Sequence, residues 1–175
     1  MTTVVFETER LCLRHVDAQD AAFVLELVNE PSWLRFVGDR GVHNLDDARA
    51  FIDNGPRKMY AQHGFGLFVV ERKADTVPMG LCGLIRRETL PDVDIGFAFL
   101  PRFWGKGYAR EAAAATLKYA REVQHLDRVV AITKPDNISS GRLLERIGLR
   151  LEGMIRLQGS DEELNYYGAT LPHEE

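Results

Sequence analysis

Residues 92–123 read DVDIGFAFLPRFWGKGYAREAAAATLKYAREV, and three patterns follow one another in this stretch. The first part has a period of two, which predicts a strand with a large apolar face and a small face: Val93, Ile95, Phe97 and Phe99 alternate with Asp94, Gly96 and Ala98. The small face would let a ligand lie close to the backbone. Pro101 ends the strand because it has no N–H group to donate. We therefore expect a strand, a glycine turn and an alanine-rich helix at the centre of the fold.

The glycine turn, RFWGKGYA at residues 102–109, has the properties of an anion site. Gly105 and Gly107 can adopt backbone conformations that residues with a Cβ avoid, so successive N–H groups can point into one concavity. No Ser, Thr, Asp or Asn stands at residues 105–107, so the first N–H groups of the helix lack a side-chain cap. Arg102 and Lys106 add positive charge. The turn predicts a phosphate cradle, and a plain glycine loop with its N–H groups in water is the alternative.

Several other kinds of site are excluded by residue type. A P-loop requires Lys where Tyr108 stands, and a dinucleotide fingerprint requires a third glycine where Arg110 stands. The sequence has no G-x-S-x-G elbow, so a serine hydrolase of that type is not expected. The five histidines are scattered and no pair has helical i, i+4 spacing. We therefore expect no metal site.

The composition is typical of a single globular domain, which we expect to cover residues 1–175. The 26 acidic and 22 basic residues give a net charge of −4, which argues against nucleic acid as a partner. No signal pattern and no apolar run long enough to cross a bilayer occur, so we expect a cytoplasmic protein without a membrane partner. Cys12 and Cys82 lie in strand-like runs and are expected to be buried free thiols.

The remaining elements are predicted from periodicity and from capping or turn residues. We expect strands at residues 6–16, 65–71, 79–87, 93–100, 128–133, 149–157 and 164–171. We expect helices from the cap Asp17 to about residue 29, from Asp46 or Asp47 to about residue 63, from the glycine turn to residue 123, and from Ser139 or Ser140 to Ile147. Pro31 should end the first of these helices, and the Asn-Gly-Pro run at 54–56 should break or kink the second.

These elements predict an α+β fold, with about four helices around a mixed sheet of about seven strands. The hairpins give antiparallel pairs. The central helix joins the strands at 93–100 and 128–133 as a parallel pair, and this crossover should be right-handed. An opening between the ends of two parallel strands is a place where ligands bind.

Three features together resemble the GNAT superfamily of acyl-CoA-dependent N-acyltransferases. They are the order of the elements, the turn Arg102-x-x-Gly105-x-Gly107-x-Ala109, and the run NISSGRLLERIGL at residues 137–149. The resemblance covers nearly the whole chain and implies a GNAT-like sheet that is splayed at its centre. The opening ETERLCLR at residues 7–14 and the block FWGKGYAREA at residues 103–112 are similar to the branch that includes the N-terminal acetyltransferases of ribosomal proteins.

By this resemblance the ligand is acetyl-CoA, used as a cosubstrate. Its pyrophosphate would lie beside Arg102 on the N–H groups at the helix start, which belong to Gly105, Lys106, Gly107, Tyr108 and Ala109. Phe99 and Leu100 would offer backbone groups to the pantetheine arm. The amide of Asn137 would bind that arm from the other side, and a turn-forming Asn is the alternative.

The implied reaction is direct attack of a primary amine on the thioester in a ternary complex. Asp94 matches a Glu in many relatives and would anchor the ammonium group or orient a water relay; a solvated strand residue is the alternative. Many relatives have a general-acid Tyr at the position of Leu144. Leucine cannot protonate a thiolate, so Ser140 is the replacement that we consider. Its alternative role is to cap its helix.

The acceptor is expected to be a protein N-terminus or a small-molecule amine. Its pocket would include residues 32–45, which have no clear period and contain Trp33 and Phe36. These aromatic residues could line the pocket or pack its underside. A monomer and a homodimer both remain possible. The alternative function is a catalytically weak CoA-binding or sensing domain, since Leu144 and the short Asp94 depart from the family pattern.

Overall fold

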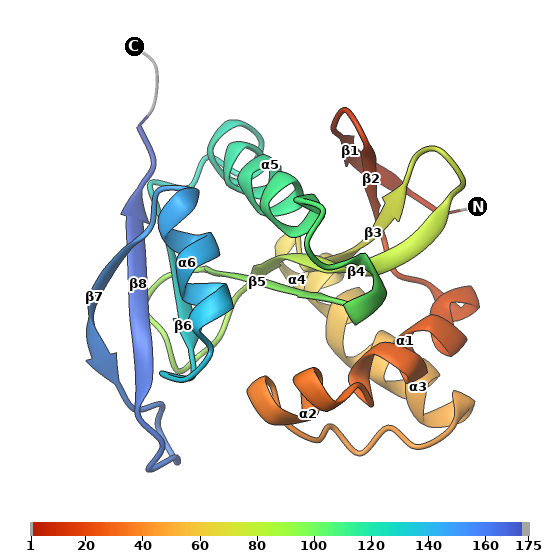
Figure 1. The fold of residues 1–175 in the computed structure, drawn as a ribbon, viewed down its shortest axis with the longest axis horizontal. Helices are drawn as coiled ribbons and strands as arrows, with labels where there is room; N and C mark the ends of the chain where they lie inside the picture. Colours follow the sequence, from red (N-terminus) through yellow and green to blue (C-terminus); the bar gives the residue numbers. More distant parts are fainter. Residues whose placement is uncertain (1, 173–175) are drawn as a thin grey trace.

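The computed structural model describes residues 2–172, and its centre is one eight-stranded mixed sheet (Figure 1). The strands are β1 (Val4–Glu7), β2 (Leu11–Arg14), β3 (Leu67–Arg72), β4 (Val77–Ile85), β5 (Asp94–Phe99), β6 (Arg128–Thr133), β7 (Arg150–Ile155) and β8 (Leu164–Thr170). Their order in the sheet is β1-β2-β3-β4-β5-β6-β8-β7. Only β5 and β6 pair in parallel; the other neighbours are antiparallel.

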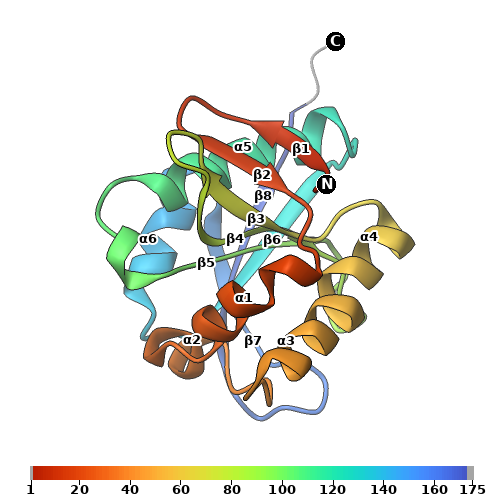
Figure 2. The ribbon, with the colours of Figure 1, turned by 90° about the vertical axis from the view of Figure 1, so that its right-hand side faces the viewer.

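Helices cover both faces of this sheet. They are α1 (Ala21–Val28), α2 (Pro31–Phe36), α3 (Leu45–Ile52), α4 (Lys58–His63), α5 (Tyr108–Glu122) and α6 (Ile138–Arg146). Figures 1 and 2 show α5 and α6 on one face and α1 and α3 on the other. The α+β fold, the hairpins and the parallel pair across the central helix are thus as predicted.

The predicted strand at residues 6–16 is wrong, because this segment belongs to two antiparallel strands. Glu7 of β1 pairs with Cys12 of β2, and the Thr8 N–H donates to the Leu11 carbonyl at 2.9 Å. The turn between them contains neither glycine nor proline, so the sequence gives no turn signal there. This hairpin accounts for the eighth strand.

The helices of the first half also differ from the prediction. Asp17 caps a short 3-10 helix (Ala18–Asp20) that leads into α1, as predicted. Pro31 not only follows α1 but also begins α2. The N–H of the first helical residue has no acceptor within the helix, so a proline at this position costs no hydrogen bond. Residues 32–45 are therefore not wholly irregular. Asn44 caps α3 by accepting from the Asp47 N–H at 2.8 Å, so neither Asp46 nor Asp47 is the cap.

The expected break at residues 54–56 is a π-helical segment (Asp53–Arg57) between α3 and α4. Pro56 lies inside it and cannot donate the hydrogen bond that a regular α-helix needs at that position. Helical structure continues without a gap from Leu45 to His63, so the run interrupts the α-helix rather than ending it.

Helix α5 lies close to the sheet because the side chains on its buried face are small. Ala112, Ala113, Thr116 and Ala120 are fully buried. The Thr116 hydroxyl donates to the Ala112 carbonyl at 2.8 Å and lies 3.4 Å from the Cys82 sulfur. Cys12 and Cys82 are buried free thiols, as predicted.

The sheet opens between β5 and β6. Asp94 and Val130 are the only paired residues of these strands, and the Val130 N–H donates to the Val93 carbonyl at 3.0 Å. Beyond this point the two strands diverge. The opening is the central splay that the resemblance implied.

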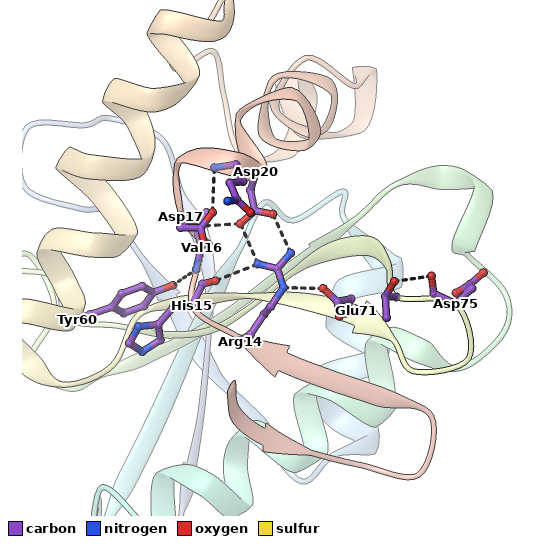
Figure 3. A network of polar contacts seen from close by, with 10 residues as sticks. Arg14, His15, Val16, Asp17, Asp20, Tyr60, Glu71 and Asp75 are labelled. Atoms are coloured by element: carbon purple, nitrogen blue, oxygen red, sulfur yellow. Dashed lines mark hydrogen bonds and ion pairs between the residues drawn. The ribbon is translucent and has the colours of Figure 1, made fainter. Parts of the chain in front are cut away.

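A buried ionic network attaches the first helices to β2 and β3 (Figure 3). The Arg14 guanidinium donates to both oxygens of Asp20 at 2.9 and 2.8 Å and to Glu71 at 2.6 Å. A buried arginine is tolerated when its donors are satisfied in this way. Beside it, the Val16 N–H donates to the Tyr60 hydroxyl at 3.2 Å. The network fixes the first helices on β2 and β3, away from the splay.

Candidate active site

The glycine turn leads directly into the start of α5. Gly105 and Gly107 have φ of 77° and 81°, a left-handed conformation that residues with a Cβ rarely adopt. Gly107 is the N-cap of α5, and no side chain caps the helix. Apart from its two chain neighbours, no other residue in the described range 2–172 has an atom within 4 Å of the place where a Cβ would stand on Gly105. The geometry therefore fits an anion that approaches the first helical N–H groups.

The positive charge near this turn is distributed unequally. Arg102 forms an ion pair with Glu26 of α1 at 2.5 Å, so its charge is partly compensated. The Lys106 side chain is exposed, and no carboxylate of residues 2–172 forms an ion pair with it. Of the two predicted cations, Lys106 is thus the one available to an anion.

The backbone groups of Phe99 face the splay. The Leu100 N–H donates to the Met79 carbonyl of β4 at 2.9 Å. Successive residues of a strand direct their backbone groups to opposite edges, so those of Phe99 face the edge where β6 diverges. The Phe99 carbonyl accepts a hydrogen bond from the indole N–H of Trp104 at 2.8 Å. Sequence reasoning missed Trp104, although a Trp directly before Gly105 was a signal.

Asn137 and Ser140 lie on the other side of the splay. Asn137 is the N-cap of α6, and its side-chain oxygen accepts from the Ser140 N–H at 3.3 Å. Ser140 therefore does not cap the helix, which leaves its hydroxyl free for another role. Leu144 is fully buried, so that position contributes to the core.

Asp94 is the first residue of β5 and the one that pairs with β6, and the splay begins directly after it. Its side chain is only 2 % exposed, so the alternative of a solvated strand residue is wrong. Burial raises the pKa of Asp94 to about 6, although the Arg87 guanidinium, 3.0 Å away, opposes this shift. The carboxyl therefore titrates much closer to neutral pH than an ordinary Asp does.

The aromatic residues predicted for the acceptor pocket belong to α2. Trp33 is buried against Phe51, and its indole N–H has no hydrogen-bond partner among residues 2–172. Phe36 is half-buried, with the Arg35 guanidinium 4.8 Å above its ring. Arg35 also forms an ion pair with Asp136 at 2.9 Å. Helix α2 is thereby joined to the turn that precedes Asn137.

The turn between β1 and β2 contacts the start of α5 through residues that sequence reasoning missed. Glu111 lies in the first turn of α5. Its carboxylate accepts hydrogen bonds from Thr8 and Arg10. These partners are about 100 residues away in the chain, so neither periodicity nor spacing could reveal them.

Two hollows of about 360 and 500 Å³ both border Gly148 and Ala169, and neither is lined by any of the predicted site residues. No three His, Cys, Asp or Glu side chains in residues 2–172 are grouped as metal ligands. Within the same residues, no helix has both the length and the apolar character that a membrane span needs.

A family model described as the acetyltransferase (GNAT) domain matches residues 10–150. The chain belongs to the GNAT acetyltransferases. Similar proteins include the N-acetyltransferase YnaD of Bacillus subtilis, whose function is otherwise uncharacterised. It is 30 % identical over 170 residues, which cover 95 % of this chain and 96 % of YnaD.

Solved GNAT structures superpose on nearly the whole chain. A GNAT-family acetyltransferase from Bacillus anthracis is 28 % identical with a TM-score of 0.78, covering 97 % of this chain and 98 % of that one. RimL, a ribosomal L7/L12 alpha-N-protein acetyltransferase in complex with coenzyme A, is 19 % identical with a TM-score of 0.80, covering 96 % and 98 %. The family, the fold and the enzyme class expected from the sequence, an N-acetyltransferase, are thus confirmed.

Proposed function

We propose that this GNAT enzyme transfers an acetyl group from acetyl-CoA to a primary amine, by direct attack while both substrates are bound. The observation that carries the proposal is the uncapped start of α5 beside the splay between β5 and β6. A helix start of this kind favours a pyrophosphate. A gap between two strands leaves backbone N–H and C=O groups unpaired, and an extended arm can form hydrogen bonds with them. Acetyl-CoA has both parts.

The residues around the splay have separate binding roles in this proposal. The N–H groups of Gly107, Tyr108 and Ala109 bind the pyrophosphate, and Lys106 adds charge. Phe99 offers its backbone N–H to the pantetheine arm, whereas the Leu100 N–H is used by the Met79 carbonyl and the Leu100 carbonyl by the Phe103 N–H. The Asn137 side-chain oxygen is used by its helix, so its amide nitrogen is the group left to bind the arm.

Bound acetyl-CoA supplies the activated acetyl group. The reaction forms a bond between the amine nitrogen and the acetyl carbon and breaks the bond between that carbon and sulfur. The amine must first lose a proton, and the departing thiolate must gain one. Asp94, with its raised pKa, takes the amine proton directly or through a water molecule. The Ser140 hydroxyl hydrogen-bonds to the departing thiolate and passes a proton to it while it takes one from water, so Ser140 ends the step unchanged.

For the acceptor we propose a protein N-terminus, with a small-molecule amine as the other outcome of the test. RimL, by its description, acts on the N-terminus of a ribosomal protein. The acceptor would enter beside α2, where Phe36 is partly accessible and Trp33 supports it from the core.

Two measurements test this function. Calorimetric titration with acetyl-CoA should give a Kd in the micromolar range. Release of free thiol should then require an amine, so a peptide with a free N-terminus, the same peptide already acetylated, and a polyamine are compared. Turnover with the free peptide alone supports a protein N-terminus, and turnover with the polyamine alone supports a small amine. A folded protein that does not bind acetyl-CoA would refute the proposal.

A further inference from the structure

A cluster of contacts attaches the β1–β2 turn to the start of α5. The Arg10 Nε–H donates to one oxygen of Glu111 at 2.7 Å, and the Arg10 backbone N–H donates to the other at 3.1 Å. That second oxygen also accepts from the Thr8 hydroxyl at 2.5 Å. These bonds alone would be an ordinary link between two elements of a fold.

The same arginine also contacts the glycine turn. Its Nη1 donates to the Lys106 carbonyl at 3.0 Å, and its guanidinium lies 4.4 Å from the centre of the Tyr108 ring. A Cβ placed on Gly107 would be 3.4 Å from the Arg10 Nη2. Arg10 thus contacts Lys106 and Tyr108 of the proposed cradle and lies beside Gly107.

The bond to Lys106 affects the orientation of the cradle. In a trans peptide unit the C=O and the following N–H point in opposite directions. Because Arg10 holds the Lys106 carbonyl on its own side, the Gly107 N–H points away from Arg10. Two glycines in left-handed conformation would otherwise leave this peptide free to turn.

Arg10 also acts on the charge beside the cradle. Glu111 lies in the first turn of α5, where a carboxylate suits the helix dipole but repels a bound pyrophosphate. Burial alone would raise the pKa of Glu111, but the hydrogen bonds from Thr8 and Arg10 outweigh it and lower the pKa. Glu111 is therefore ionised, and the Arg10 guanidinium is the cation that compensates it.

We propose that Arg10 is a positioning residue for the acetyl-CoA cradle. It holds the Lys106 carbonyl so that the N–H groups of the turn face the ligand, and it neutralises Glu111 so that the helix start accepts an anion. This inference rests on the proposed function, because it concerns the same site. It adds the β1–β2 turn to that site.

The test compares the Kd for acetyl-CoA, measured by calorimetry, among matched variants. Arg10→Ala should raise the Kd by about tenfold or more, the order of one lost charge-assisted interaction. Arg10→Lys keeps the charge but not the planar fork, so its Kd should be intermediate. Arg49→Ala is the control, because Arg49 forms an exposed ion pair on α3 and its loss changes the net charge equally; its Kd should match the wild type.

A double variant separates the contributions. Glu111→Gln should change the Kd only slightly, and Arg10→Ala with Glu111→Gln should bind more tightly than Arg10→Ala alone, because no uncompensated carboxylate remains. In steady-state assays Arg10→Ala should raise the KM for acetyl-CoA while leaving kcat and the KM for the amine near the wild-type values. A purely structural role would not produce this split.

The outcomes distinguish this inference from the proposed function. A wild type that binds acetyl-CoA, together with a folded Arg10→Ala of equal Kd, overturns the role of Arg10 and leaves the function intact. No gain from Glu111→Gln in the double variant contradicts the charge compensation. If Arg10→Ala does not fold, Arg10→Lys decides: a wild-type Kd there contradicts the positioning role of the fork. A wild type that does not bind acetyl-CoA removes both proposals.

Discussion

The two helix starts beside the splay are built in opposite ways. Helix α5 begins after Gly107, which is in a left-handed conformation, and no side chain caps it. Helix α6 begins after Asn137, whose side-chain oxygen accepts from the Ser140 N–H. Every helix start has N–H groups without partners in the helix, and a side-chain cap is worth about 1 kcal/mol. Helix α6 has this stabilisation, whereas no side chain accepts from the first N–H groups of α5.

Other helix starts in the protein support this reading. Asn44 caps α3, and Asp17 caps the 3-10 helix before α1. Helix α2 has no side-chain cap, but it begins with Pro31, which has no N–H. An uncapped start is therefore not rare by itself. The start of α5 differs because it combines two left-handed glycines with a neighbouring exposed lysine.

The largest expected effect comes from placing a carboxylate at the uncapped start. Gly107→Glu introduces a negative charge into the cradle and a side chain at a φ of 81°. We expect acetyl-CoA binding to weaken by about 100-fold, equivalent to about 3 kcal/mol. Calorimetry measures the Kd, and a melting curve shows whether the variant is folded.

The matched control is Gly159→Glu. Gly159 has a similar φ of 86° and open space around it, but it lies in the turn between β7 and β8. It should cost similar backbone strain without weakening acetyl-CoA binding. Equal losses of affinity in both variants would show that strain, rather than charge in the cradle, is responsible.

The next effect concerns the strand that leads to the uncapped helix. Asp94→Asn should lower kcat by about 100-fold, the usual order for loss of a general base. In the wild type, kcat/KM should rise with pH around 6, where Asp94 ionises. Unchanged activity in the variant would mean that another group accepts the proton.

Asp94 also makes stability depend on pH. Burial raises its pKa in the folded protein to about 6, above the ordinary value of 3.8 in the unfolded chain. Its contribution is fully present below about pH 4 and is lost as pH rises through about 6. The loss amounts to roughly 3 kcal/mol. The free energy of unfolding of Asp94→Asn should therefore increase relative to wild type across this window, as urea titrations at several pH values would show; a constant difference would contradict it.

A smaller effect comes from removing the cap on the other helix. Asn137→Ala should lower the free energy of unfolding by about 1 kcal/mol, because the Ser140 N–H loses its acceptor. Asn137→Ser restores a capping oxygen but not the amide N–H. Its stability should be near the wild type while its KM for acetyl-CoA is raised. Wild-type KM in Asn137→Ser would show that Asn137 serves α6 alone.

The smallest effect is expected where α2 meets the turn before α6. Arg35→Ala breaks the exposed ion pair with Asp136, and such pairs contribute less than about 1 kcal/mol. The melting temperature should fall slightly at low salt and match the wild type at high salt, because salt screens exposed charges. A large loss that persists at high salt would mean that Arg35 has a structural role beyond this pair.

Much of the fold could be predicted because its signals are local. The period of two in β5, the small buried face of α5 and the glycines at its start are all contained within residues 92–123. The β1–β2 turn was missed because it has no turn residues. Helix α2 was missed because its six residues are too few to show a period and depend on the burial of Trp33.

The candidate site was predictable only in part, for a different reason. Backbone conformation at Gly105 and Gly107 follows from residue type, so the cradle could be expected. The burial of Asp94 depends on the packing of several elements, and its partner Arg87 lies in the segment between β4 and β5. The bond between Arg10 and Glu111 joins residues 101 positions apart. Such contacts exist only after the sheet has formed.

The order of the strands has a consequence for the protein during its synthesis. Strand β8 lies between β6 and β7 in the sheet, although the ribosome makes β7 first. Until residues 164–170 have emerged, β7 has no partner and the outer edge of β6 is open. Unpaired edges of this kind are prone to aggregation. The part of the sheet that lies beyond β6 is thus completed last, after the glycine turn and α5 have been made.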